Sequence, residues 1–222
     1  MTLAVISVIL FGTREDPGQQ TFARRDPGLP VAVIDAGHGG IDGGASTSSG
    51  VTESGINLSI AKKLDLMLRL CGYDTLMLRR EDISLHGPDA RTVREMKASD
   101  LKNRAEAANA VDRGILISIH QNKFPQKQYY GAQVFYTAHP ESEPLARAIQ
   151  EHLRFLDPSN KRVHARAAES IYLLRAADCP AVLVECGFLS NDEEANRLCD
   201  DGYRKSIAAA IACAFTAAGI YG

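Results

Sequence analysis

The sequence lacks several features that mark particular classes of protein. The apolar run at residues 3–12 has only about ten residues, too few for a helix that crosses a membrane. The net charge of -2 and the pI near 6.3 give no electrostatic reason to expect a nucleic-acid partner or tight binding to an anionic membrane. The five cysteines form no Cys-x-x-Cys pair, and their odd number and wide spacing favour small buried side chains over a disulfide framework. We find no internal repeat and no low-complexity tract.

The composition that remains is typical of a globular protein with one hydrophobic core. Apolar residues make up 45% and charged residues 23% of the 222 residues, so we expect a single folded domain. We assign it to residues 31–222. Residues 13–30 contain three prolines and two glycines, which is the composition of a linker.

Residues 1–12 have the length of the apolar part of an export signal. No lysine or arginine precedes the apolar run, so we interpret the segment as the remnant of a signal or anchor. A frayed or sheet-edge terminus is the alternative. An export signal would place the protein outside the cytoplasm, and the same segment would attach it weakly to a membrane.

Apolar strand patterns alternate with helical patterns along the domain. Apolar residues recur at helical spacing from Ile56 to Leu68, and Gly72 ends that helix. We expect further helices at 99–111, 144–156 and 203–218, a loop at 83–97, and strands at 31–36, 73–78, 115–119, 131–137, 171–174 and 181–184. This alternation predicts an α/β fold, a mostly parallel twisted sheet of about six strands with helices on both faces.

Three polar residues stand at or just past the ends of apolar strands. His38 lies in a glycine-rich stretch after the first strand, His120 follows 115–119, and Glu185 follows 181–184. A lone histidine between glycines is equally well explained as part of a tight turn. In parallel sheets, however, ligands bind where the strands run out at their carboxyl ends. We therefore expect these side chains to converge on one site.

Two histidines and a carboxylate would form a catalytic zinc site. Such a site needs about three protein ligands and one open position for water. A separate carboxylate must act as the general base when that water attacks an amide. Glu53 and Glu185 compete for these two roles, and their spacing does not decide between them.

Four motifs in sequence order resemble the zinc-dependent N-acetylmuramoyl-L-alanine amidases with a His-Glu-His metal site. These motifs are Asp35-Ala-Gly-His-Gly-Gly40, Glu53, Ser118-Ile-His-Gln-Asn122 and Val184-Glu-Cys-Gly-Phe-Leu-Ser-Asn191. The resemblance implies one Zn²⁺ per chain, with His38, Glu53 and His120 as metal ligands and Glu185 as the catalytic base. Residues 31–222 would then be the catalytic domain.

Within this family the chain looks most like the germination-specific amidases of spore-forming bacteria. The resemblance implies hydrolysis of the amide between N-acetylmuramic acid and L-alanine in peptidoglycan, during spore cortex maturation, so that a muramic lactam can form. It also raises the expectation of a regulatory partner, because a lipoprotein serves some relatives. Two alternatives are a zinc peptidase acting within the stem peptide and a wall- or partner-binding module without turnover.

Other polar residues receive structural interpretations. Gln121 replaces a small residue usual in the family, which would reshape the substrate groove without touching the metal. We expect the basic cluster Lys161, Arg162 and Arg166 to be a solvated edge rather than a substrate site. Some family-like positions are expected to fix loops and helix ends, with direct substrate contact as the alternative: Asn57, Arg79 with Asp82, Arg104 with Asn109, and Asn191.

Overall fold

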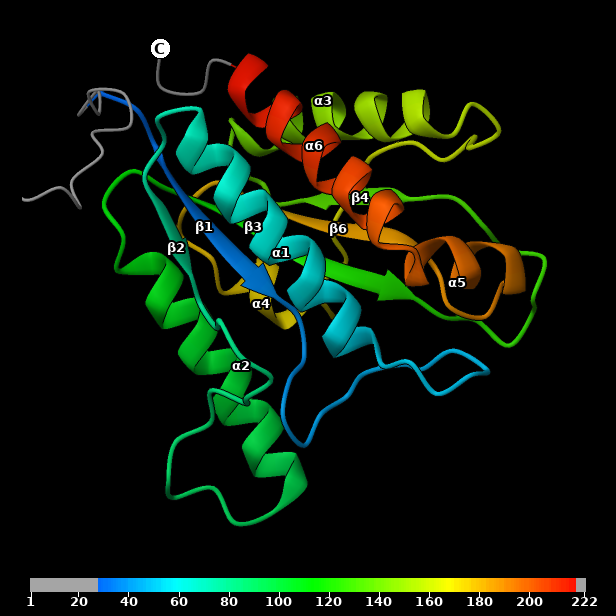
Figure 1. Cartoon of the computed structure of the whole chain (residues 1–222). Coiled ribbons are helices and arrows are strands. Elements are labelled where there is room, and N and C mark those ends of the chain that lie inside the picture. The colour runs from blue at the N-terminus through cyan, green and yellow to red at the C-terminus, as the bar shows by residue number, and fades with distance from the viewer. Residues whose placement is uncertain (1–27, 219–222) are drawn as a thin grey trace, which may run out of the picture.

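The computed structural model describes residues 28–218, so the expected export signal and nearly all of the expected linker lie outside the described residues (Figure 1). Its strands are β1 (Val31–Ala36), β2 (Thr75–Met77), β3 (Gly114–Asn122), β4 (Gln133–Tyr136), β5 (Ala165–Arg166) and β6 (Ala181–Phe188). Its helices are α1 (Glu53–Leu70), α2 (Val93–Asn109), α3 (Ser142–Leu156), α4 (Tyr172–Arg175), α5 (Asp192–Cys199) and α6 (Asp201–Ala217).

The six strands form one sheet in the order β2-β1-β3-β6-β4-β5. Strands β2, β1, β3 and β6 pair in parallel, whereas β4 pairs antiparallel with β6 and parallel with β5. The expectation of a mostly parallel sheet is therefore confirmed. The register places His120 opposite Glu185, and Glu185 opposite Gln133.

Helices cover both faces of the sheet, as the alternating pattern predicted (Figure 1). Ala32 and Ile34 of β1 pack with apolar residues of α1, α3 and α6, whereas Val33 packs with residues of α2 and α4. Successive strand residues point to opposite faces, so a continuous apolar strand such as β1 fits a sheet covered on both sides. None of the helices within residues 28–218 is long and apolar enough to cross a membrane.

Two predicted elements were wrong. Residues 171–174 were expected as a strand, but Tyr172–Arg175 is helix α4. A four-residue apolar run carries too little periodicity to separate the two structures. The loop predicted at 83–97 ends early, because α2 begins at Val93. Thr92 and Glu95 form a capping box there, in which each side chain bonds the other residue's backbone N–H. This local signal carries no hydrophobic periodicity.

Several elements extend beyond or add to the prediction. Strands β3 and β6 continue past the apolar runs, so His120 and Glu185 lie within strands rather than in the loops that follow. The short strand β5 and helix α5 were not expected. Asn191 caps α5 by accepting hydrogen bonds from the backbone N–H of Glu193 and Glu194.

Candidate metal centre and active site

His38 stands in the glycine-rich loop that follows β1, with a positive φ of 60°. Its Nδ1 lies 3.0 Å from Oδ2 of Asp42, and its Nε2 lies 3.2 Å from Oε1 of Glu53. A Cβ atom at Gly44 would lie 2.6 Å from Glu53 Oε2 and 2.7 Å from the His38 ring. Only glycine at position 44 leaves room for His38 and Glu53 to approach each other.

His120 reaches the same carboxylate from β3. Its Nδ1 lies 3.0 Å from Oε1 of Glu53, and its ring packs edge-on to that of His38, with centroids 5.0 Å apart. The other side of the imidazole lies against the backbone of Gly37, where a Cβ atom would come within 2.1 Å of Nε2. The absence of a side chain at Gly37 therefore sets the position of the His120 ring.

Glu53 is the first residue of α1 and is only 3% exposed. Its Oε2 accepts a hydrogen bond from the backbone N–H of Ala45 at 2.9 Å, and its Oε1 accepts one from Gln121 N at 3.1 Å. Burial raises the pKa of Glu53, but the hydrogen bonds and charges of His120 and His38 outweigh it. They hold the pKa of this carboxyl well below its usual range.

These three side chains form the one cluster of histidine, cysteine and acidic ligand atoms found among residues 28–218 that could hold a metal ion. One ligand atom from each of His38, Glu53 and His120 lies within 4.8 Å of the other two. Two imidazole nitrogens facing a carboxylate oxygen match the donor preference of zinc. Burial lowers the pKa of His38, yet hydrogen bonds and charges of Glu53 and Asp42 raise it to about 9. The site therefore attracts positive charge, and the donor set fits a divalent cation.

Glu185 occupies the neighbouring strand position to His120 but is not a member of this cluster. Its Oε2 is buried and has no hydrogen-bond partner among the described residues. Burial raises the pKa of Glu185 to about 7; the Glu53 charge adds to this effect, and the charges of His120 and His38 oppose it. A carboxylate with a pKa near neutrality is suited to accept and return a proton.

Two buried arginines fix the backbone that carries His38. Arg104 pairs with Asp35 at 2.5 Å and donates to the carbonyl oxygens of Ala36 and His38. Arg79 donates to the carbonyl oxygens of Ala36, Gly37 and Ser54. Both side chains therefore hold the loop between β1 and α1 in place, which agrees with the structural interpretation given to them.

The remaining family-like positions also make structural contacts. Asn57 donates to Gly37 O, and Gln121 donates to Asn57 Oδ1. Gln121 therefore supports, through Asn57, the loop that follows β1. Asp82 accepts from the backbone N–H of Gly40 rather than from Arg79. Asn109 does not contact Arg104; it bonds Asp178 and Ala176 beyond α4.

Asp42 is a site residue to which the sequence analysis gave no role. Besides His38 Nδ1, it binds Lys97 Nζ at 2.9 Å. A carboxylate on the second nitrogen of a metal-binding imidazole fixes its tautomer and orientation. The signal was available, because Asp42 lies four residues after His38 in the same glycine-rich stretch.

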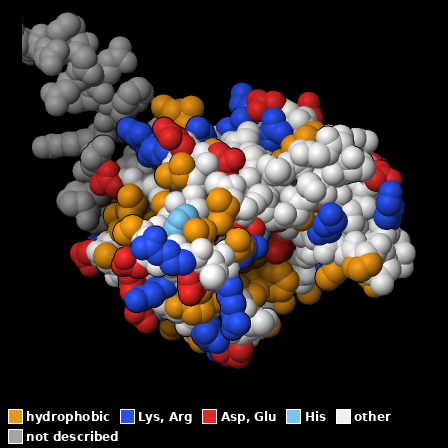
Figure 2. All heavy atoms as spheres, turned by 90° about the horizontal axis from the view of Figure 1, so that it is seen from below, with side chains coloured by type: hydrophobic (Ala, Val, Ile, Leu, Met, Phe, Trp, Pro, Cys, Tyr) orange, Lys and Arg blue, Asp and Glu red, His pale blue; other side chains and the backbone are white. Residues whose placement is uncertain are grey.

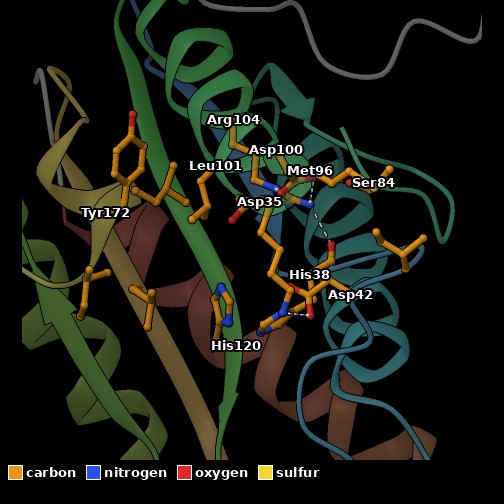
Figure 3. A pocket seen from close by; sticks show the side chains of 16 residues that line it. Asp35, His38, Asp42, Ser84, Met96, Asp100, Leu101, Arg104, His120 and Tyr172 are labelled. Carbon is orange, nitrogen blue, oxygen red and sulfur yellow. Dashed lines mark hydrogen bonds and ion pairs between the residues drawn. The ribbon is translucent and has the colours of Figure 1, made fainter. Parts of the chain in front are cut away.

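A pocket opens beside His38 and His120 toward α2 and α4 (Figure 3). Its wall is largely apolar and includes Ile41, Met96, Leu101, Ile171, Leu173 and Leu183. Figure 2 shows a histidine side chain reaching the surface among hydrophobic and basic side chains. The side chains of His38 and His120 are 25% and 20% exposed, so both histidines are open to solvent on one side.

The fold and this arrangement define the class of protein as an α/β enzyme with a His-Glu-His group that could hold a metal ion and a further carboxylate beside it. Residues 32–217 match the family described as N-acetylmuramoyl-L-alanine amidase, and the chain belongs to that family. The resemblance inferred from the four sequence motifs is thereby confirmed.

Named relatives support the assignment. The germination-specific N-acetylmuramoyl-L-alanine amidase of Bacillus subtilis is 34% identical over 182 residues, which cover 82% of this chain and 76% of that protein. The structure of the CwlD amidase from Clostridioides difficile, in complex with the GerS lipoprotein, is 38% identical. It has a TM-score of 0.81 and covers 86% of this chain and 98% of that chain. The AmiC2 amidase of Nostoc punctiforme is 27% identical, with a TM-score of 0.72 over 84% of this chain and 95% of that chain.

Proposed function

We propose that the protein hydrolyses the amide bond between N-acetylmuramic acid and L-alanine in peptidoglycan, with one zinc ion held by His38, Glu53 and His120. The observation that carries this proposal is the convergence of these three donors from the loop after β1, from α1 and from β3 in a member of the amidase family. A bound zinc ion would polarise the scissile carbonyl and make a water molecule acidic enough to attack it near neutral pH.

Glu185 acts as the general base in this proposal. Its unpartnered carboxylate oxygen takes a proton from the attacking water as the new C–O bond forms. When the C–N bond breaks, the same carboxyl returns the proton to the departing amine of L-alanine. Burial favours both steps, because it raises the pKa of Glu185 to about 7 and so makes its two protonation states similar in free energy.

Asp42 and the two buried arginines act as positioning residues. Asp42 Oδ2 accepts a hydrogen bond from His38 Nδ1–H, which leaves the lone pair of Nε2 directed toward Glu53. Arg79 and Arg104 hold the carbonyl groups of the loop that carries His38. The ligand geometry is thus set by the protein before a metal binds.

Product analysis tests the activity. Purified peptidoglycan is treated with the zinc-loaded protein, and the muropeptides are analysed by mass spectrometry. We expect peptides with a free L-alanine amino terminus and glycans that have lost the peptide. New termini within the stem peptide would instead establish the zinc peptidase alternative, and retention on the wall without cleavage would establish the binding module.

We further propose that the protein acts outside the cytoplasm in spore cortex maturation. This rests on its similarity to the germination-specific amidase of Bacillus subtilis. Residues 1–12 would be the remnant of an export signal or weak membrane anchor, residues 13–30 the linker and residues 31–222 the catalytic domain. N-terminal sequencing of the exported protein tests the first part. A cortex with normal muramic lactam content in a deletion strain would contradict the second.

A regulatory lipoprotein partner is the last part of this proposal. The CwlD amidase from Clostridioides difficile was solved in complex with a lipoprotein. We expect the purified chain alone to hydrolyse peptidoglycan slowly, and a lipoprotein fraction from sporulating cells to raise the rate. Full activity of the purified chain, unchanged by that fraction, would contradict a required partner.

A further inference from the structure

Arg162 differs from its neighbours in the basic cluster that we expected to be a solvated edge. Lys161 and Arg166 are exposed, but Arg162 is partly buried and held in place. Its Nε donates to Tyr130 O at 2.8 Å, and its Nη1 donates to Gln133 Oε1 at 3.0 Å. The guanidinium also stacks over the ring of Phe188, 4.5 Å from its centroid. Its position is therefore fixed by the surrounding protein.

The positive charge of Arg162 is not paired with a carboxylate among residues 28–218. No ion pair within residues 28–218 includes Arg162, and no residue in that part of the chain accepts a hydrogen bond from its Nη2. Arg79, by contrast, is buried and has donors occupied by four backbone carbonyl groups. A fixed guanidinium with an unused donor is suited to bind a carboxylate.

The sheet register connects Arg162 to the proposed active site. His120, Glu185 and Gln133 are direct neighbours on β3, β6 and β4, so their side chains share one face of the sheet. Arg162 extends this row through its hydrogen bond to Gln133. Strands are about 5 Å apart, so the guanidinium lies on the order of 10 Å from the Glu185 carboxyl group.

A surface hollow adjoins this end of the row. It is lined by Gln128, Tyr129, Tyr130, Lys161 and Arg162. Two cations and two tyrosine rings provide positive charge together with flat apolar surface, which fits an anionic peptide. The pocket on the other side of the histidines is mainly apolar. Its two cations are already paired with carboxylates, Lys97 with Asp42, and Arg104 with Asp35 and Asp100.

We propose that Arg162, with Lys161 beside it, binds a free carboxylate of the stem peptide and thereby selects peptides in which that group is not amidated. This inference rests on the proposed amidase function. An extended peptide advances about 3.5 Å per residue, so carboxylates on the second or third residue of the stem peptide reach about 7 to 10 Å beyond the scissile amide. That range matches the place of Arg162 in the row.

Defined muropeptides test the inference with the zinc-loaded full chain. Three substrates are compared: one with free carboxylates, one amidated on the second residue and one amidated on the third. We expect amidation at one of these positions to lower kcat/KM by about tenfold to a hundredfold, mainly through KM. The position that matters identifies which carboxylate is bound.

Variants separate substrate binding from a structural role. Arg162→Gln should cleave the free and the amidated substrate with similar kcat/KM. Arg162→Lys should retain part of the preference for the free carboxylate, because lysine keeps the positive charge but lacks the planar guanidinium group. Arg166→Gln, an exposed member of the same cluster, should keep the full preference. An equal loss of kcat/KM on all substrates in Arg162→Gln would overturn the inference. Equal kcat/KM of the wild-type protein on free and amidated substrates would also overturn it. Failure of the wild-type protein to cleave any of the three would contradict the proposed function itself.

Discussion

Replacing Gly37 with alanine is the sharpest test of how the site is built. The φ of Gly37 lies outside the left-handed region, so alanine imposes no backbone strain there. Its new Cβ, however, would lie 2.1 Å from Nε2 of His120. Non-bonded heavy atoms settle at about 3.5 Å or more, so the imidazole must move by more than about 1 Å.

That displacement changes the position of His120 Nδ1 relative to Glu53 Oε1, which lies 3.0 Å away in the wild-type protein. Metal–ligand distances are held to about 0.2 Å, so a shift of this size weakens the metal site directly. A 1 Å misplacement in an active site costs about 10²-fold in rate. We therefore expect Gly37→Ala to lower both zinc affinity and kcat/KM by at least that factor, while the fold is retained because the ring is part of the site rather than of the hydrophobic core.

Zinc affinity is measured by competition with a chelator, and turnover by release of peptide from purified peptidoglycan. Gly87→Ala is the matched control, because a Cβ atom there meets Ser99 Oγ at 3.6 Å, an ordinary contact, without a positive φ. Thermal unfolding of both variants shows whether the fold is intact. Gly37→Ala with normal zinc affinity and normal turnover would refute the geometry described for His120.

The remaining predictions concern the carboxylates around the site. Glu185→Gln should keep zinc but lower kcat by about 10²- to 10⁴-fold, and near-normal turnover in a peptide-release assay would refute its role as base. Asp42→Asn should weaken zinc binding by about 10- to 100-fold in chelator competition, because His38 loses the acceptor on Nδ1; unchanged affinity would contradict this. Burial raises the pKa of Asp35, but Arg104, together with His120 and Ser118, outweighs burial and holds that pKa below the ordinary value of 3.8. The folded-state pKa is the lower one, so the pair contributes stability above pH 3.8 that is lost as the pH falls. We expect Arg104→Gln to cost about 3–5 kcal/mol at pH 7 in urea unfolding, and a smaller loss at low pH; a pH-independent loss would contradict the pairing.

The sequence predicted the parts of the fold that depend on periodicity. Helix α1 carries apolar residues at helical spacing over 18 residues, and the prediction of its end near Gly72 was confirmed. Helix α4 has only four residues, and its apolar run fits a strand equally well. The start of α2 depended on a capping box at Thr92, a local signal that hydrophobic periodicity does not contain.

The two glutamates show where spacing stops being informative. Both Glu53 and Glu185 come close to His120, one from a helix start and the other from the adjacent strand. Their separation along the chain does not show which carboxylate also reaches His38. That depends on the loop held by Arg79 and Arg104, which brings His38 within 3.2 Å of Glu53. Long-range packing therefore decides the ligand set.

The roles of Arg79, Arg104 and Arg162 also cannot be predicted from the sequence alone. They look alike in the sequence, yet Arg104 is paired with Asp35 and Arg79 is surrounded by carbonyl groups. Arg162 is partly exposed and has no carboxylate partner within residues 28–218. A buried guanidinium must satisfy its donors within the protein, since leaving them unpaired costs free energy. A half-exposed guanidinium can leave a donor to solvent or to a ligand. The burial of each arginine, which follows from the fold, thus separates the two that shape the site from the one available to a substrate.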